Sequence, residues 1–117
     1  MPVFEAWDVV KVPFPYTNRP VRQRRPGLVL RSGEREGIIP HLLWVLMITS
    51  SENRGWHGDV EISDLVISGL PAPSIVRTAK IATIEASDAD RIGRLSAPDR
   101  LQVARCIRSA LRRALNG

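Results

Sequence analysis

Short apolar segments that end at proline, glycine or polar residues constrain this chain most, because strands are the elements of that length. The segment at 7–14, WDVVKVPF, alternates as a half-buried strand does, with Val10 and Val12 on one side. The segment at 42–51, LLWVLMITSS, is apolar at nearly every position, which is typical of a central strand buried on both faces, with Trp44 in the core. Further strands are predicted at 27–30 (GLVL), 59–63 (DVEIS) and 75–85 (IVRTAKIATIE), the last as two short strands or one bent strand.

The C-terminal segment predicts an amphipathic helix. Ser96 with Asp99 three residues later resembles a capping box, and Arg112 and Arg113 suit the negative end of a helix dipole. Strands followed by a helix predict one domain, 1–117, that is mainly β with a C-terminal α-helix, folded as a bent antiparallel sheet or small barrel. Apolar residues recur at helical spacing at Leu101, Ala104, Ile107, Leu111 and Ala114.

Basic residues outnumber acidic ones in these 117 residues, 17 to 12, which gives a formal net charge of +5. A polyanionic partner is compatible with this balance, although a generic solvated surface gives the same charge. The many arginines among the basic residues favour a polyanionic partner, because the planar guanidinium matches phosphate geometry. The segment at 15–25 has no apolar period and should be an exposed loop. The arginines form two clusters, one of Arg19, Arg22, Arg24 and Arg25 and one of Arg100, Arg105, Arg108, Arg112 and Arg113.

The N-terminal sequence and the cysteine content indicate a cytoplasmic protein. Cys106 is the single cysteine and cannot form an internal disulfide, and MPVFEAWDVV lacks the basic start and apolar stretch of a signal peptide. The apolar run at 42–48 is too short to cross a bilayer, so no membrane association is expected.

Several classes of chemistry are disfavoured by missing motifs. The sequence contains no Walker-type phosphate loop, no dinucleotide fingerprint and no Gly-x-Ser-x-Gly elbow. His41, His57 and Cys106 are too widely spaced to resemble a zinc site. The two histidines could still cleave RNA by acid-base catalysis, but one begins a buried strand and the other lies in a polar loop, which disfavours the pair.

Two strand ends carry the remaining candidates for chemistry, because strand ends are rigid places from which to aim side chains at a ligand. Arg25 precedes Pro26 where the arginine-rich loop enters a strand, and Thr49 and Ser50 end the buried strand with two hydroxyls. In the alternative interpretation, the hydroxyls merely terminate the strand and Arg25 is solvated.

Five segments occur in an order and spacing that are together more specific than any one of them. WDVVKVPFPYT at 7–17, RRPGLVL at 24–30, WVLMITSS at 44–51, GLPAPSIVRTAKIATIE at 69–85 and RIGRLS at 91–96 follow one another along the chain. In this order they resemble the MazF/PemK family of endoribonuclease toxins from bacterial toxin-antitoxin pairs. The resemblance extends from about Trp7 to Leu115.

The resemblance implies a fold, an activity and partners. The fold would be an SH3-like barrel with a C-terminal helix, usually assembled as a homodimer. The activity would be sequence-selective cleavage of single-stranded RNA by attack of a ribose 2′-OH on the adjacent phosphate, with no metal or other cofactor. The cognate antitoxin would place an acidic or hydrophobic tail in the RNA groove, and the complex of the two proteins would bind DNA.

The resemblance also implies catalytic residues. The family's arginine before proline corresponds to Arg25, and its Thr-Ser pair at the end of the third strand corresponds to Thr49 and Ser50. Because arginine stays protonated in proteins, Arg25 and Thr49 are expected to stabilise charge on the phosphate rather than to move a proton. RNA contacts are expected from Asn18, Arg19, Arg22, Gln23, Arg24, Arg77 and Lys80.

Three positions depart from the family pattern. Ala79 stands where some PemK-like members carry an acidic residue, so a mechanism that needs this carboxylate is not expected here. Ala6 stands where glycine is usual, which is tolerable if its φ is negative. Gly27 stands where alanine is commoner, which would mainly reduce local rigidity.

Two other functions remain open at this level. A non-catalytic RNA-binding barrel would have the same basic surface and would stack bases on exposed aromatic side chains. A toxin of the same fold could instead act on a protein target such as a topoisomerase, because fold does not determine function.

Overall fold

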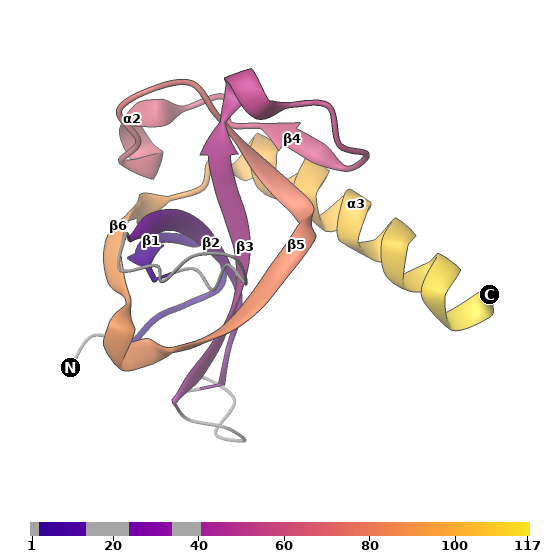
Figure 1. Cartoon of the computed structure of the whole chain (residues 1–117), viewed down its shortest axis with the longest axis horizontal. Helices are drawn as coiled ribbons and strands as arrows, with labels where there is room; N and C mark the ends of the chain where they lie inside the picture. The colour runs from indigo at the N-terminus through magenta and orange to yellow at the C-terminus, as the bar shows by residue number, and fades with distance from the viewer. Residues whose placement is uncertain (1–2, 14–23, 34–40) are drawn as a thin grey trace.

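The computed structural model describes residues 3–13, 24–33 and 41–117. Six strands form one strongly bent antiparallel sheet in the order β4-β5-β3-β2-β1-β6 (Figure 1). The strands are β1 (Asp8–Val12), β2 (Arg25–Ser32), β3 (Leu42–Ser50), β4 (Asp59–Glu61), β5 (Ser74–Glu85) and β6 (Asp90–Arg94). The helical segments are η1 (Ser51–Asn53), α2 (Leu65–Ser68), η2 (Ala86–Asp88) and α3 (Ala97–Asn116). The predicted class, mainly β with a C-terminal helix, is confirmed.

The predicted centre of the sheet is confirmed, because β3 lies between β2 and β5. The segment after residue 73 forms one strand of 12 residues, β5, whose register against β3 shifts between Leu46 and Met47. This shift marks an irregularity of the kind that bends strands, so of the two alternatives the single bent strand is correct. The burial predicted for Trp44 is wrong. Its side chain is 43% exposed and lies under the Arg31 guanidinium, 4.9 Å from the ring centroid.

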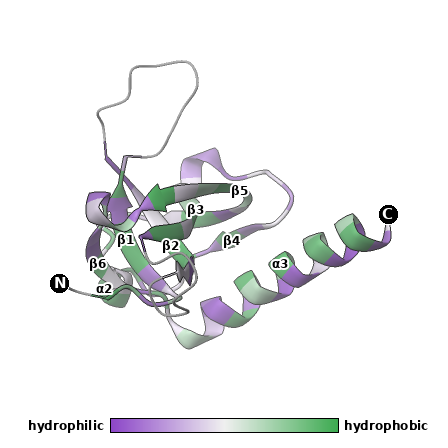
Figure 2. Ribbon diagram, turned by 90° about the horizontal axis from the view of Figure 1, so that it is seen from below, coloured by the Kyte–Doolittle hydropathy of each residue, from purple (hydrophilic) through white to green (hydrophobic). Residues whose placement is uncertain are grey.

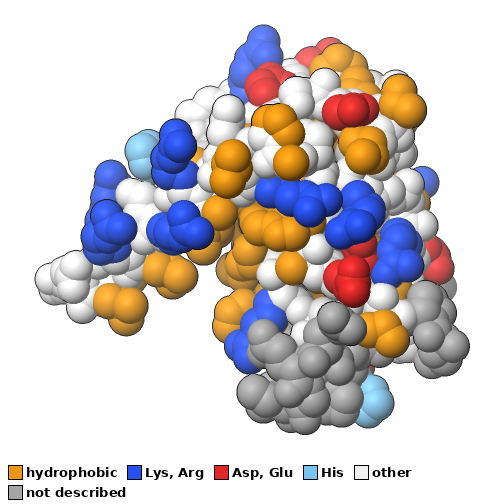
Figure 3. Space-filling view, turned by 180° about the vertical axis from the view of Figure 1, so that it is seen from behind, with side chains coloured by type: hydrophobic (Ala, Val, Ile, Leu, Met, Phe, Trp, Pro, Cys, Tyr) orange, Lys and Arg blue, Asp and Glu red, His pale blue; other side chains and the backbone are white. Residues whose placement is uncertain are grey.

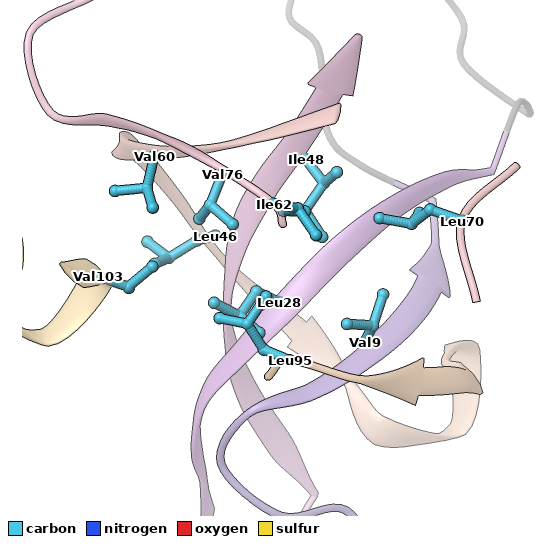
Figure 4. Packing of buried hydrophobic residues seen from close by; sticks show 10 residues of the cluster. All are labelled: Val9, Leu28, Leu46, Ile48, Val60, Ile62, Leu70, Val76, Leu95 and Val103. Carbon is cyan, nitrogen blue, oxygen red and sulfur yellow. The ribbon is translucent and has the colours of Figure 1, made fainter. Parts of the chain in front are cut away.

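The bent sheet encloses two apolar clusters. One includes Val10, Val12, Val29, Val45 and Met47, which come from the neighbouring strands β1, β2 and β3. The other joins alternate residues of β1, β2 and β3 to α3 through Val103 (Figure 4). Successive residues of a strand point to opposite faces, so these strands are buried on both sides and are fixed in register.

The predicted helix is confirmed as α3, with Ser96 as its N-cap, but the predicted capping box is wrong. The Ser96 side chain makes no cap hydrogen bond. Asp99 Oδ2 instead accepts hydrogen bonds from the Ser63 backbone N–H over 2.8 Å and from Ser63 Oγ over 3.1 Å. The carboxylate therefore attaches the first turn of α3 to the segment that follows β4.

The buried face of α3 matches the predicted one only in part, because Ile107 is packed whereas Leu101 is 69% exposed. Val103 is fully buried, with Cys106 and Ile107 packed against the same cluster. Leu111 lies about a quarter turn away on the helix, and its side chain is 56% exposed. Figure 2 shows α3 leaving the sheet, and Figure 3 shows basic side chains gathered over its projecting part. No helix in the described ranges is both long and apolar enough to span a membrane.

The backbone meets the condition stated for Ala6 and corrects the expectation for Gly27. The left-handed residue before β1 is Trp7, with φ of 76°, whereas Ala6 has negative φ. A Cβ at Gly27 would lie 2.3 Å from Val45 Cγ1, which is far inside van der Waals contact. Glycine at position 27 is therefore needed for the close approach of β2 and β3, beyond any effect on rigidity.

Candidate functional site

Arg25 and Thr49 occupy the same end of the β2–β3 pair. Arg25 begins β2 and Thr49 is the penultimate residue of β3. The antiparallel register pairs Gly27 with Met47, and Arg25 and Thr49 follow two residues further along it. Residues opposite one another in a sheet share a face, so continuing this register puts the side chains of Arg25 and Thr49 on the same face.

The hydroxyls of Thr49 and Ser50 both accept hydrogen bonds from η1 or its flank. Asn53 Nδ2 donates to Thr49 Oγ1 over 3.0 Å, and the Glu52 backbone N–H donates to Ser50 Oγ over 3.2 Å. A hydroxyl has one proton to donate, and each of these accepted bonds leaves that proton available for another acceptor. Ser50 also caps η1, which gives it a role in the local fold besides its predicted role in catalysis.

A row of paired residues runs across the sheet from Thr49. Thr49 pairs with Ile75 of β5, and Ile75 pairs with Glu61 of β4, so the three side chains share a face. Glu61 Oε2 accepts a hydrogen bond from Ser51 Oγ over 3.0 Å, and Glu61 Oε1 lies 3.0 Å from Arg54 Nη1. The carboxylate is thus held in one orientation while 53% of its side chain remains exposed.

A buried ion pair lies in the next row. Arg77 Nη2 is 3.1 Å from Asp59 Oδ2, each side chain is 8% exposed, and Arg77 Nη2 also donates to the Asn53 carbonyl oxygen over 2.7 Å. The Arg77 guanidinium lies 4.1 Å from the centroid of the Trp56 ring. Burial raises the pKa of Asp59, but the Arg77 guanidinium and two backbone N–H groups lower it by more, so the pKa falls below its ordinary 3.8.

An open hollow of about 480 Å³ adjoins these two rows. It combines one aromatic wall, one apolar residue of β5 and several charged groups, a mixture typical of ligand sites. Its lining includes Arg54, Trp56, His57, Asp59, Glu61 and Ile75.

The predicted RNA-binding residues have different environments. Asn18, Arg19, Arg22 and Gln23 lie outside the described residues. Arg24 forms a salt bridge with Asp90 and donates to the carbonyl oxygens of Lys11 (2.9 Å) and Asp88 (2.7 Å). Like Arg77, Arg24 therefore donates to acceptors within the protein. Lys80 lies in β5 and is partly exposed. Direct RNA contact stays a prediction for all of these residues.

The histidine pair can be set aside on geometry. His41 directly precedes β3 and His57 follows the other end of that strand. Nine residues of strand span roughly 30 Å, so the two imidazoles cannot act on one phosphate. Across 3–13, 24–33 and 41–117, no group of three or more His, Cys, Asp or Glu is placed to hold a metal ion.

Several residues of this region were not identified from the sequence. Asn53 follows the hydroxyl pair by only a few residues, and a polar side chain at that distance was the one local signal for its role. Asp59 was not identified either, and Arg77 was predicted only as an RNA contact. The two residues are 18 positions apart, and only the pairing of β4 with β5 brings them together.

The comparison with known families gives a match over most of the chain. Residues 5–111 match the family described as the PemK-like, MazF-like toxin of type II toxin-antitoxin systems. No curated protein sequence matches the chain.

Solved structures with the same fold have related descriptions. The Mycobacterium tuberculosis toxin MazF-mt6 is 25% identical, with a TM-score of 0.68 over 89% of this chain and 95% of its own. MazF from Deinococcus radiodurans is 22% identical, with a TM-score of 0.71 over 95% of this chain and 98% of its own. An endoribonuclease from a mycobacterial species, solved with its cognate antitoxin, is 16% identical, with a TM-score of 0.68 over 95% of each chain.

Proposed function

Because the chain belongs to the PemK-like, MazF-like toxin family of type II toxin-antitoxin systems, we propose that it is an endoribonuclease. It cleaves single-stranded RNA at selected sequences without a metal ion. The ribose 2′-oxygen attacks the adjacent phosphorus and the bond to the 5′-oxygen breaks. The 2′-hydroxyl loses its proton and the leaving 5′-oxygen gains one, so the products carry a 2′,3′-cyclic phosphate and a 5′-hydroxyl.

The placement of Arg25 and Thr49 at the same end of the β2–β3 pair carries this proposal. The reaction builds negative charge on the nonbridging phosphate oxygens, and fixed donors stabilise that charge. Arg25 supplies a permanently charged donor with two prongs. Thr49 donates its proton, because its oxygen already accepts a hydrogen bond from Asn53. Ser50 contributes a second hydroxyl at the same strand end.

The proposal includes partners. The protein acts in the cytoplasm as a homodimer and is inhibited by a cognate antitoxin. The exposed apolar side chains on the second half of α3 support self-association, because an apolar helix face gains stability when it is covered. The mycobacterial endoribonuclease of the same fold was solved with its antitoxin, which supports the second partner.

The experiment is cleavage of a long unstructured RNA in the presence of EDTA, followed by analysis of the fragment ends. Discrete fragments with 2′,3′-cyclic phosphate and 5′-hydroxyl ends are expected, and Arg25→Ala should abolish most of the cleavage. Intact RNA would contradict the proposal and favour a non-catalytic RNA binder. Fragments with 3′-hydroxyl and 5′-phosphate ends would contradict the 2′-OH mechanism.

A further inference from the structure

Trp56 is held in place by buried polar groups although much of its side chain faces solvent. The Arg77 guanidinium lies 4.1 Å from the ring centroid and is itself fixed by Asp59. Asp59 Oδ2 also accepts from the Trp56 backbone N–H over 3.1 Å, while 51% of Trp56 stays exposed. Burying the Asp59–Arg77 ion pair costs free energy because both charges lose their water. Since this pair holds an exposed indole in place, the arrangement points to a function for the Trp56 ring.

The exposed part of Trp56 lines the hollow of about 480 Å³. This volume lies in the usual range for small-molecule sites, and a planar ring stacks well on an indole face. Arg54, on the rim of the hollow, is 67% exposed and adds positive charge there, which suits a phosphate group of a bound nucleotide.

Glu61 gives the hollow its hydrogen-bonding preference. Its two carboxylate oxygens each accept one bond, from Arg54 and from Ser51, and an ionised carboxylate oxygen can accept a second. A carboxylate accepts but does not donate, so it selects a base that presents N–H groups. Guanine presents two adjacent N–H donors on its Watson–Crick edge, which match the two oxygens, whereas cytosine and adenine present one amino group beside an acceptor.

The hollow adjoins the proposed catalytic groups. Thr49 pairs with Ile75, which lines the hollow, and Ile75 pairs with Glu61, so Thr49 and Glu61 are two strand spacings apart, about 10 Å. We infer that the hollow is a subsite for an unpaired guanine base of the RNA, stacked on Trp56 and hydrogen-bonded to Glu61. This inference rests on the proposed function and assigns the base preference to Trp56 of the β3–β4 connection and Glu61 of β4.

Binding of short oligonucleotides tests the subsite separately from cleavage. The probes are four 2′-fluoro pentamers, UUXUU with X as G, A, C or U, which lack the 2′-hydroxyl needed for the reaction. Fluorescence anisotropy of end-labelled pentamers at low salt should give the tightest binding for the guanine pentamer. Trp56→Ala should weaken its binding by roughly 5- to 150-fold, the range for loss of one base–aromatic stack.

Two variants make the test specific. Glu61→Gln should keep the stack but reduce the preference for guanine over adenine by roughly tenfold, because an amide has only one acceptor oxygen. Trp44→Ala is the matched control, since Trp44 is also half-exposed under an arginine but lies outside the hollow. It should leave affinity unchanged, and circular dichroism should give all three variants the wild-type spectrum.

Each outcome separates the subsite from the catalytic proposal. Equal binding of the four pentamers, or equal losses in Trp56→Ala and Trp44→Ala, would overturn the subsite even if RNA is cleaved. Guanine binding that depends on Trp56 in a protein that leaves RNA intact would support the subsite and contradict the endoribonuclease.

Discussion

Asn53 donates a hydrogen bond to Thr49 Oγ1 over 3.0 Å, so the Thr49 hydroxyl has its proton left for a phosphate oxygen. Asn53→Asp should reverse this arrangement, because a carboxylate accepts and would attract the Thr49 proton. We expect Asn53→Asp to slow cleavage by roughly a hundredfold, the scale for loss of one transition-state donor, and Asn53→Ala to slow it less. Single-turnover cleavage measures both rates. Equal rates for Asn53→Asp and wild type would exclude Thr49 as a donor.

Arg25 provides the second test of the catalytic proposal. Arg25→Ala should slow cleavage by roughly a hundredfold or more. Arg25→Lys should restore little, because an ammonium keeps the charge but lacks the planar two-pronged donor. Arg31→Lys, at the other end of the same strand, is the matched control and should cleave normally. Near wild-type cleavage by Arg25→Lys would show that Arg25 contributes only its charge, as part of a diffuse basic surface.

Gly27 tests the packing that sets the distance between β2 and β3. Gly27→Ala places a methyl group 2.3 Å from Val45 Cγ1, and Val45 is fully buried. Overpacking of this kind should lower the free energy of unfolding by about 1–3 kcal/mol. In the Gly27→Ala, Val45→Ala double variant the added methyl has room, so the two losses should be less than additive. Urea denaturation measures the coupling, and strict additivity would mean that the two side chains do not compete for space.

The strands and the helix were predictable because their signals are local. Alternation and apolar runs depend only on neighbours in sequence, and β1, β3 and α3 formed where these patterns occur. The exposure of Trp44 was not predictable in this way. Trp44 lies on the same face of β3 as Leu46, two residues earlier in the strand. Leu46 packs in the cluster that includes Val103 of α3, whereas the Trp44 indole is exposed. How much of this face α3 covers depends on where the helix crosses the sheet.

The candidate site was predictable only where strand ends mark it. Arg25 and Thr49 each stand at a recognisable boundary between an apolar strand and polar residues. The Arg77–Asp59 pair has no such boundary, because its partners meet through the register of β5 with a strand of three residues. The capping role predicted for Asp99 is wrong for the same reason, because it depends on a contact between distant residues. The Asp99 carboxylate accepts a hydrogen bond from Ser63, which is 36 residues away in the sequence.

The second apolar face of α3 leads to a prediction about assembly. Leu111 and Leu115 are 56% and 83% exposed, and covering them in a homodimer would remove apolar surface from water. Light scattering at micromolar concentration should give twice the chain mass of 13.0 kDa. The double variant Leu111→Glu, Leu115→Glu should give the monomer mass. Gln102→Glu, about half a turn from Leu111, adds one negative charge on the opposite side of the helix and should remain dimeric. A wild-type monomer would contradict the homodimer.

Asp59 predicts how stability depends on pH. Its pKa in the folded protein lies below the ordinary 3.8, so its ionised form stabilises the fold at any pH above that value. This contribution is lost as pH falls through the lowered folded pKa. Asp59→Asn leaves the buried Arg77 guanidinium without its counter-charge and should cost about 3 kcal/mol at pH 7.

The difference between wild type and Asp59→Asn should therefore narrow as pH falls below 3.8, because protonation removes the same charge from the wild-type protein. Urea denaturation from pH 7 to pH 2.5 measures this difference. Glu61→Gln is the control, because the Glu61–Arg54 pair is exposed and its loss should cost less than about 1 kcal/mol. A difference between wild type and Asp59→Asn that stays constant over the whole range would show that the Asp59 charge does not stabilise the fold. The burial of the Arg77 guanidinium beside the Trp56 ring would then need another explanation.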